Sequence, residues 1–238
     1  MKPVIHGQVP ENASCLGAAT LCAIVLHAAT GGEGDGHHTM APKTIRSAAH
    51  LYNPRGERLY LNDAECGRFL DALEGRNCVT RLLCLVLYFT GVRVSEALAI
   101  RHGDMQFESG IIAIRSLKKR GLHHVREVHV PLWLSMELER FMAERPSGAR
   151  FFPVDRTTAW RQVTALMNEA GIMGAHACPK GLRHAFGVRA ILASVPLPVL
   201  QKWMGHARME TTTIYTRVTG REERQLAEVM FGGNPKRP

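Results

Sequence analysis

Residues 77–90 (NCVTRLLCLVLYFT) are the part of the chain that most restricts its fold. Apolar side chains occupy most of the circumference of the helix that this stretch would form, so a buried helix is expected. Covering such a helix takes several further elements, and 238 residues are enough for one or two domains. No stretch reaches the roughly 18 apolar residues of a membrane span, so a membrane-spanning protein is excluded.

Further helices dominate the sequence from residue 59 onward. Asn62 followed by apolar positions three and four apart indicates a capped amphipathic helix. In another helix, Trp160, Val163 and Met167 are expected to share one face. That helix is predicted at residues 157–170, and the remaining ones at residues 94–100, 132–142, 181–194, 197–204, 209–215 and 222–230.

Strand patterns are confined to one region. Two alternating β-rich runs, 110–115 and 125–130, predict a hairpin with a long basic turn at 117–124. The βαβ alternation of a dinucleotide fold is absent. The predicted class is therefore mainly α (α+β), a helical domain with one small antiparallel sheet.

Composition divides the chain into three parts. Residues 1–58 contain an Ala-rich apolar stretch followed by the run GGEGDG, and they predict a poorly structured extension with one helix and a linker. Residues 59–230 contain the predicted elements and form the main domain. Residues 231–238 are predicted to be a flexible tail.

The charge of the chain favours a polyanionic partner. The formal net charge is +9 and the pI is near 9.6. Residues 59–238 hold 25 basic and 17 acidic side chains, so the excess belongs to the main part of the chain.

Cysteine usage indicates a reducing compartment. The six cysteines are scattered, no C-x-x-C occurs, and nothing resembles a disulfide framework. We therefore expect a cytoplasmic protein. Cys15 and Cys22 have histidines nearby, but their spacing matches no familiar zinc pattern, so no metal site is predicted.

Two stretches place a basic side chain where it needs a partner. In TGVRVSEAL, Arg93 follows the buried helix and a glycine, which is costly unless an anion meets the guanidinium. Glu96, three residues along, can hold that group, and an ordinary Arg–Glu pair is the alternative. In LKKR, Lys118 lies in the hairpin turn, where an ammonium can bind phosphate or give up a proton; a solvated basic turn is the alternative.

Two further stretches lie near the C-terminus. In PKGLRHAF, Lys180 and Arg183 are one helical turn apart at a predicted helix start, where backbone amides favour an anion. The adjacent His184 is interpreted as a histidine that packs in the core or orients the helix. In WMGHARMETTTIY, His206 precedes Tyr215 by nine residues. Each stretch has an ordinary structural explanation by itself, but the four together are far more specific.

Together the four stretches resemble the tyrosine recombinase (phage integrase) family. The catalytic domain of that family carries Arg, Lys, His-x-x-Arg, His or Trp, and Tyr in this order. TGVRVSEAL resembles the first arginine box, LRHAF the second and WMGHARMETTTIY the histidine-to-tyrosine box, and the resemblance covers about residues 61–224. The catalytic residues that it implies are Arg93, Lys118, Lys180, Arg183, His206 and Tyr215.

The resemblance implies a site-specific DNA recombinase or integrase. Arg93 and Arg183 would clamp the scissile phosphate, and Tyr215 would attack it to form a 3′-phosphotyrosine. Lys118, or Lys119 if the register of the turn differs by one residue, would protonate the leaving 5′ oxygen. His206 would hydrogen-bond the phosphate. Such chemistry requires neither a metal nor a nucleotide cofactor.

The implied partners are double-stranded DNA at recombination sites and further copies of this chain, assembled as a tetramer on DNA. No membrane partner is expected. Basic residues outside the catalytic set are expected in part to touch the DNA backbone, and they are Arg120, Arg126, Arg156, Arg161, Lys202 and Arg208.

The chain departs from the family pattern in two ways. Lys180 stands where most members have histidine, and a lysine is a poor base unless its pKa is depressed. The 58 residues before the main domain are fewer than the 80–100 or so of a DNA-clamping domain. Both departures favour the alternative of a truncated relative that binds recombination sites without strand exchange. A type IB topoisomerase is a third hypothesis.

Overall fold

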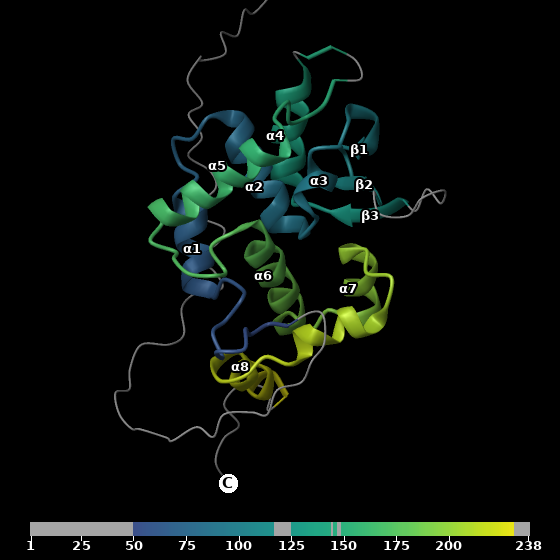
Figure 1. Cartoon of the computed structure of the whole chain (residues 1–238). Coiled ribbons are helices and arrows are strands. Elements are labelled where there is room, and N and C mark those ends of the chain that lie inside the picture. Colours follow the sequence, from purple (N-terminus) through teal and green to yellow (C-terminus); the bar gives the residue numbers. More distant parts are fainter. Residues whose placement is uncertain (1–49, 117–124, 144, 147–148, 231–238) are drawn as a thin grey trace, which may run out of the picture. The chain divides into compact units, whose positions relative to one another are not determined.

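The structure is a computed structural model that describes residues 50–116, 125–143, 145–146 and 149–230. Its elements and their order are shown in Figure 1. The α-helices are α1 (Asp63–Asp71), α2 (Cys78–Thr90), α3 (Val94–Ala97), α4 (Leu132–Ala143), α5 (Arg156–Glu169), α6 (Pro179–Leu192), α7 (Leu197–Met204) and α8 (Arg221–Met230). The 3₁₀ turns are η2 (His102–Asp104), η3 (Met209–Thr211) and η4 (Thr213–Thr216).

The buried helix predicted at residues 77–90 is confirmed as α2. Leu82, Leu83 and Cys84 have no exposed surface, and α2 packs against α3, α4, α5, α6 and β3. The side chain of Asn77 caps its first turn by accepting a hydrogen bond from the Thr80 amide. Gly91 ends it with φ +60°, a left-handed conformation that glycine adopts without strain. This stop directs the chain sharply into the residues that precede α3.

The predicted hairpin is confirmed as two strands of a small antiparallel sheet. Strands β2 (Ile111–Arg115) and β3 (Val125–His129) pair from Ile111 opposite His129 to Arg115 opposite Val125. A short strand β1 (Met105–Gln106), which the sequence did not predict, pairs with β2 and completes the order β1-β2-β3. The turn at 117–124, with Lys118 and Lys119, lies outside the described residues.

One expectation about helices is wrong. Residues 209–215 form the two 3₁₀ turns η3 and η4 in place of an α-helix, and these turns bring Thr212 into the interior, completely buried and with its hydroxyl 2.9 Å from a histidine nitrogen. In α5, Trp160, Val163 and Met167 share one face as expected; Val163 and Met167 are buried, and Trp160 is 49% exposed. Trp160 lies in the first turns of α5, at the edge of the apolar stripe, and this position leaves its ring largely in solvent.

Residues 50–58 lie against the main domain. Leu51 is 3% exposed and belongs to the core, and the Tyr52 hydroxyl accepts hydrogen bonds from the amide and hydroxyl of Thr219. Residues 1–49 and the tail 231–238 lie outside the described part, so the domain limits predicted from composition stay a prediction. Among the described helices, none is long and apolar enough to cross a membrane.

Helix α6 starts against the backbone of the preceding loop. A side chain on Gly181 would overlap the carbonyl oxygen of His176, whereas one on Gly67 of α1 would meet nothing within 4 Å. We therefore expect Gly181→Ala to lower the free energy of unfolding by about 1–3 kcal/mol. Gly67→Ala is the matched control and is expected to be neutral or stabilising by up to about 1 kcal/mol. Urea unfolding of both variants checks this, and equal stabilities would contradict the close approach at Gly181.

Candidate active site

Arg93 lies at the start of α3, directly after the turn that Gly91 makes at the end of α2. Its backbone amide donates to one carboxylate oxygen of Glu96 (3.0 Å), and its Nη1 donates to the other (3.0 Å). The Arg93 side chain is 30% exposed, while that of Glu96 is 2% exposed. The guanidinium is thus oriented from inside the protein, with part of it open to solvent.

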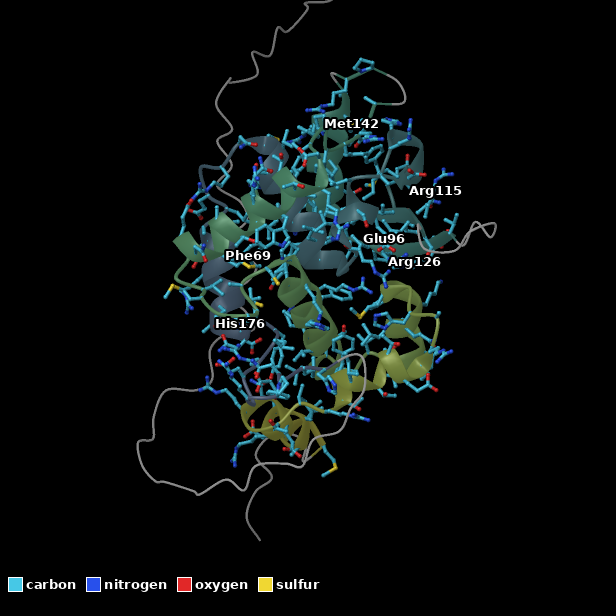
Figure 2. The ribbon with its side chains drawn as sticks, in the orientation of Figure 1. Phe69, Glu96, Arg115, Arg126, Met142 and His176 are labelled. Carbon is cyan, nitrogen blue, oxygen red and sulfur yellow. The ribbon has the colours of Figure 1, made fainter. Side chains whose placement is uncertain are left out.

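Glu96 also holds a second arginine, which comes from the sheet. Arg126 on β3 donates Nη2 to Glu96 (2.8 Å) and Nε to the carbonyl oxygen of Trp203 (2.8 Å). Figure 2 shows Glu96 and Arg126 next to each other, between the sheet and α7. The Arg126 side chain is 1% exposed. The expectation that it belongs to the surface residues available to a DNA backbone is therefore wrong.

The Glu96 carboxylate is charged in this position. Burial by itself would raise its pKa, but the hydrogen bonds and charges of Arg126 and Arg93 outweigh burial and lower the pKa below its ordinary value. One buried anion therefore stands between two cations.

Arg183 of α6 connects the remaining segments of the site. Its Nη1 donates to the carbonyl oxygen of Gly91 (2.5 Å), and its Nη2 donates to that of Met204 (2.7 Å) and lies 3.0 Å from Nε2 of His206. Burial, followed by the nearby charge of Arg93, lowers the pKa of Arg183 to about 10. The group stays a cation at neutral pH, so two positive charges meet at one place.

The contacts of His206 identify its tautomer. Arginine can only donate, so Nε2 of His206 must accept from Arg183. The opposite nitrogen, Nδ1, lies 2.9 Å from the hydroxyl of Thr212 and therefore carries the proton that it donates there. Burial and the charges of Arg183 and Arg93 lower the pKa of His206 to about 3, which agrees with a neutral ring.

Tyr215 is packed inside the domain, on η4. It is 1% exposed, and its ring is stacked on that of His206 with 6.3 Å between centroids and 8° between planes. A side chain on Gly187 of α6 would overlap the Tyr215 ring, so this glycine gives the ring its place. The hydroxyl lies 3.1 Å from Nδ1 of His184. Burial raises the pKa of Tyr215 to about 12, although Arg183 and Arg93 act in the opposite direction.

The structure thus brings together four of the six residues expected in the site, Arg93, Arg183, His206 and Tyr215. Lys180 is exposed in the first turn of α6, three residues before Arg183, and its charge acts on His184. A cavity of about 320 Å³ opens beside the group and is lined in part by Ser116, Lys202 and His206.

A known protein family matches the domain that holds these residues. The sequence pattern of the phage integrase family matches residues 59–222. The chain belongs to the phage integrase family. The part that the structure describes is a tyrosine recombinase catalytic domain with the predicted class of fold, helical with one small antiparallel sheet.

Relatives in this family are tyrosine recombinases. The chain is 28% identical over 205 residues to the tyrosine recombinase XerA of Pyrococcus furiosus, covering 78% of this chain and 70% of that protein. It is 27% identical over 207 residues to the tyrosine recombinase XerH of Campylobacter jejuni, covering 78% of this chain and 56% of that one. The chain therefore spans between about half and 70% of the length of these relatives.

Solved structures of the family share the fold. The crystal structure of XerA recombinase superposes with a TM-score of 0.63 at 24% identity, over 74% of this chain and 66% of that one. The catalytic domain of bacteriophage HP1 integrase gives a TM-score of 0.55 at 21% identity, over 74% of this chain and 95% of that domain.

Three residues of this integrase-family site were missed or misplaced by sequence reasoning. Arg126 and the buried Val128 lie two residues apart on the inward face of β3, and this spacing was the available signal that Arg126 is buried. Thr212 lies within a run of three threonines, and nothing in that run marks the buried one. His184 was interpreted as a core residue, and it is buried, but it also contacts Tyr215.

The Glu96 carboxylate provides a test of how the site is held together. Removing one partner of a buried pair leaves uncompensated charge, so we expect Glu96→Gln to lower the free energy of unfolding at pH 7 by about 3–5 kcal/mol. Glu228→Gln is the control, since Glu228 forms an exposed pair with Arg224 and is expected to cost about 0.5 kcal/mol or less.

The stability that Glu96→Gln loses depends on pH, and it decreases as the pH falls. The pKa of Glu96 is lowered by folding, so its contribution is complete above the unfolded-state pKa and disappears as the pH falls through the folded-state pKa. The difference between wild type and Glu96→Gln is therefore expected to shrink from about pH 4.5 downward. Urea unfolding between pH 7 and pH 3 measures it, and a constant difference would show that the charge of Glu96 is unimportant.

Proposed function

We propose that this chain cleaves and rejoins double-stranded DNA at specific sites through a covalent 3′-phosphotyrosine intermediate on Tyr215. The observation that carries the proposal is the connected group Arg93, Arg183, His206 and Tyr215, which unites residues from α3, α6, the turn after α7 and η4. Family membership supplies the reaction class, since the relatives are tyrosine recombinases.

The two arginines suit a phosphodiester under attack. Negative charge grows on the non-bridging oxygens in the transition state, and planar guanidinium groups can donate to those oxygens in pairs. Arg93 and Arg183 repel each other in the free protein, where the charge of Arg93 adds to the larger effect of burial in lowering the pKa of Arg183. A phosphate between them offsets that repulsion. Relief of the repulsion therefore contributes favourably to the free energy of substrate binding.

His206 positions Arg183 before it can meet a phosphate. In the neutral ring, Nε2 accepts from Arg183 and is not a donor. Donation to the phosphate requires Arg183 to release this nitrogen and a proton to be on Nε2. The ring can reach that state by moving its proton to Nε2, with Nδ1 then accepting from the Thr212 hydroxyl, or by gaining a second proton. A bound phosphate favours the second route, because burial and the charges of Arg183 and Arg93 lower the pKa of His206 and the phosphate offsets those charges.

The covalent step exchanges one phosphate ester for another. The Tyr215 oxygen bonds to phosphorus, the bond to the 5′ oxygen breaks, and that oxygen takes up a proton. The reverse attack by a 5′ hydroxyl rejoins the strand, so no cofactor is required. Lys118, or alternatively Lys119, is our proposed proton donor, and both lie outside the described residues. Lys180 is proposed to donate to a phosphate oxygen.

The partners we propose are double-stranded recombination sites and further copies of the chain as a tetramer. The net charge of +9 and the position of Lys202 in the lining of the cavity beside His206 support binding of a nucleic-acid backbone. The alternative, a relative that binds such sites without cutting, is favoured by Lys180 in place of histidine. Covalent capture of DNA distinguishes the two, and exchange between two sites distinguishes a recombinase from a topoisomerase.

Tyr215→Phe tests the nucleophile. The change removes one oxygen from a buried ring, so DNA binding is expected to persist while covalent attachment disappears. The assay uses duplexes from the DNA that flanks the gene, nicked so that the cleaved fragment is lost and the adduct accumulates. A denaturation-resistant complex with the Phe variant would identify another nucleophile, and none with wild type would favour the binding-only alternative.

Arg183→Lys tests the phosphate clamp. A lysine keeps the charge but cannot reach two carbonyl oxygens and a phosphate with one ammonium, so cleavage is expected to fall about 100-fold or more. Single-turnover cleavage measures the loss. The control is Arg224→Lys on exposed α8, which should cleave at the wild-type rate. Near-normal cleavage by Arg183→Lys would remove Arg183 from the phosphate site.

A further inference from the structure

His184 contacts the atom that the proposed reaction uses as its nucleophile. It lies on α6, four residues after Lys180 and directly after Arg183, and it is 7% exposed. Its Nδ1 is 3.1 Å from the hydroxyl oxygen of Tyr215. Its other nitrogen, Nε2, is buried and has no hydrogen-bond partner in the part of the chain that the structure describes.

Counting donors and acceptors indicates where the protons are. If Nδ1 carried the proton and donated it to Tyr215, the tyrosine O–H and the lone pair on Nε2 would both be left without partners. If Nδ1 accepts from the tyrosine O–H, only the N–H at Nε2 is left. The second arrangement leaves fewer buried polar groups unsatisfied and is therefore the more stable one. The Tyr215 proton then points at a basic nitrogen.

Lys180 is poorly placed to accept the proton of Tyr215. It is exposed, so its ammonium is hydrated, and an ammonium has no lone pair with which to accept a proton. His184 is uncharged at neutral pH, because burial and the charges of Lys180 and Arg183 lower its pKa to about 4. Besides those two cations, the titratable groups facing it are Tyr215 and His206.

We propose that His184 is a catalytic residue that accepts the proton of Tyr215 during attack on the phosphate. This inference rests on the proposed function. As the bond from the Tyr215 oxygen to phosphorus forms, the O–H proton passes to Nδ1 and leaves an imidazolium, while the 5′ oxygen departs and is protonated elsewhere. On rejoining, the imidazolium returns its proton to the phenol oxygen. The proposal requires the hydrogen bond between Nδ1 and the hydroxyl, seen in the free protein, to be kept when DNA binds.

The charges around His184 explain why the proton of Tyr215 is transferred only when a phosphate is bound. In the free protein the phenol is a far weaker acid than the imidazolium, with pKa values of about 12 and about 4, so the proton stays on Tyr215. A bound phosphate offsets Lys180 and Arg183, which makes His184 more basic. Formation of the bond to phosphorus makes the phenol proton acidic, so both changes favour transfer during the attack.

The test compares His184→Asn with wild type in single-turnover cleavage of nicked duplexes. An asparagine oxygen can take the place of Nδ1 as an acceptor, but it is not basic. At pH 7 we expect cleavage to fall about 100-fold or more. Between pH 6.5 and 8.5 the wild-type rate should be flat, whereas the variant rate should rise about tenfold per pH unit, since hydroxide must then remove the proton. His102→Asn, an exposed histidine replaced in the same way, is the control and should match wild type.

A substrate with a better leaving group distinguishes a variant that lacks the proton acceptor from a variant that lacks the proton donor. With sulfur in place of the scissile 5′ oxygen, the leaving thiolate needs no proton. A defect in the proton donor is then relieved, but the defect of His184→Asn should remain about the same size. A flat pH profile in His184→Asn, or recovery on the sulfur substrate, would overturn the proposal.

The tautomer can be measured without any variant of His184. Imidazole ¹⁵N shifts of the wild-type protein free of DNA should show a proton on Nε2 and a hydrogen-bonded, unprotonated Nδ1. Tyr215→Phe should change the Nδ1 shift most, because it removes the hydrogen bond to that nitrogen. A proton on Nδ1 in the free protein would overturn the proposal. Failure of wild type to capture DNA, with the expected tautomer present, would instead count against the proposed function.

Discussion

The carboxylate of Glu96 is the interaction on which the rest of the site depends. It is almost completely buried between Arg93 and Arg126, which come from a short helix and from the sheet. Without this anion, three guanidinium groups would face one another across a few side chains, because Arg183 also lies near Arg93. Glu96 therefore allows a fold to hold concentrated positive charge before any phosphate arrives.

Helix α6 distributes the chemistry along one of its faces. Lys180, Arg183, His184 and Gly187 recur at the spacing of three and four that places residues on the same side of a helix. About two turns of α6 thus carry two cations, the proposed base His184 and the glycine against which the Tyr215 ring packs. Replacing a histidine by lysine at position 180 need not end proton transfer, since position 184 presents an imidazole to the same tyrosine.

Much of this arrangement follows from local sequence, and the remainder follows from packing between distant segments. The apolar run at 77–90 and the spacing in TGVRVSEAL identified α2 and the Arg93–Glu96 pair, because both depend on neighbours within one or two helical turns. Arg126 differs. The alternation along β3 indicates that its side chain faces inward, but its partner Glu96 lies 30 residues away in the sequence, and no local pattern identifies that pair. The 3₁₀ turns that precede and contain Tyr215 likewise bury Thr212, and only the packed domain provides that burial.

The burial of Tyr215 also bears on selectivity. With 1% of the residue exposed, the phenol cannot react during a brief encounter with an arbitrary stretch of duplex. In the proposed reaction, side chains that cover Tyr215 must move before a phosphate can reach its hydroxyl, while the contact with His184 is kept. A complex must then last longer than this movement takes, so we expect sites bound for long to be cut and sites bound briefly to be released intact. A covered nucleophile can in this way protect the rest of a genome from breakage.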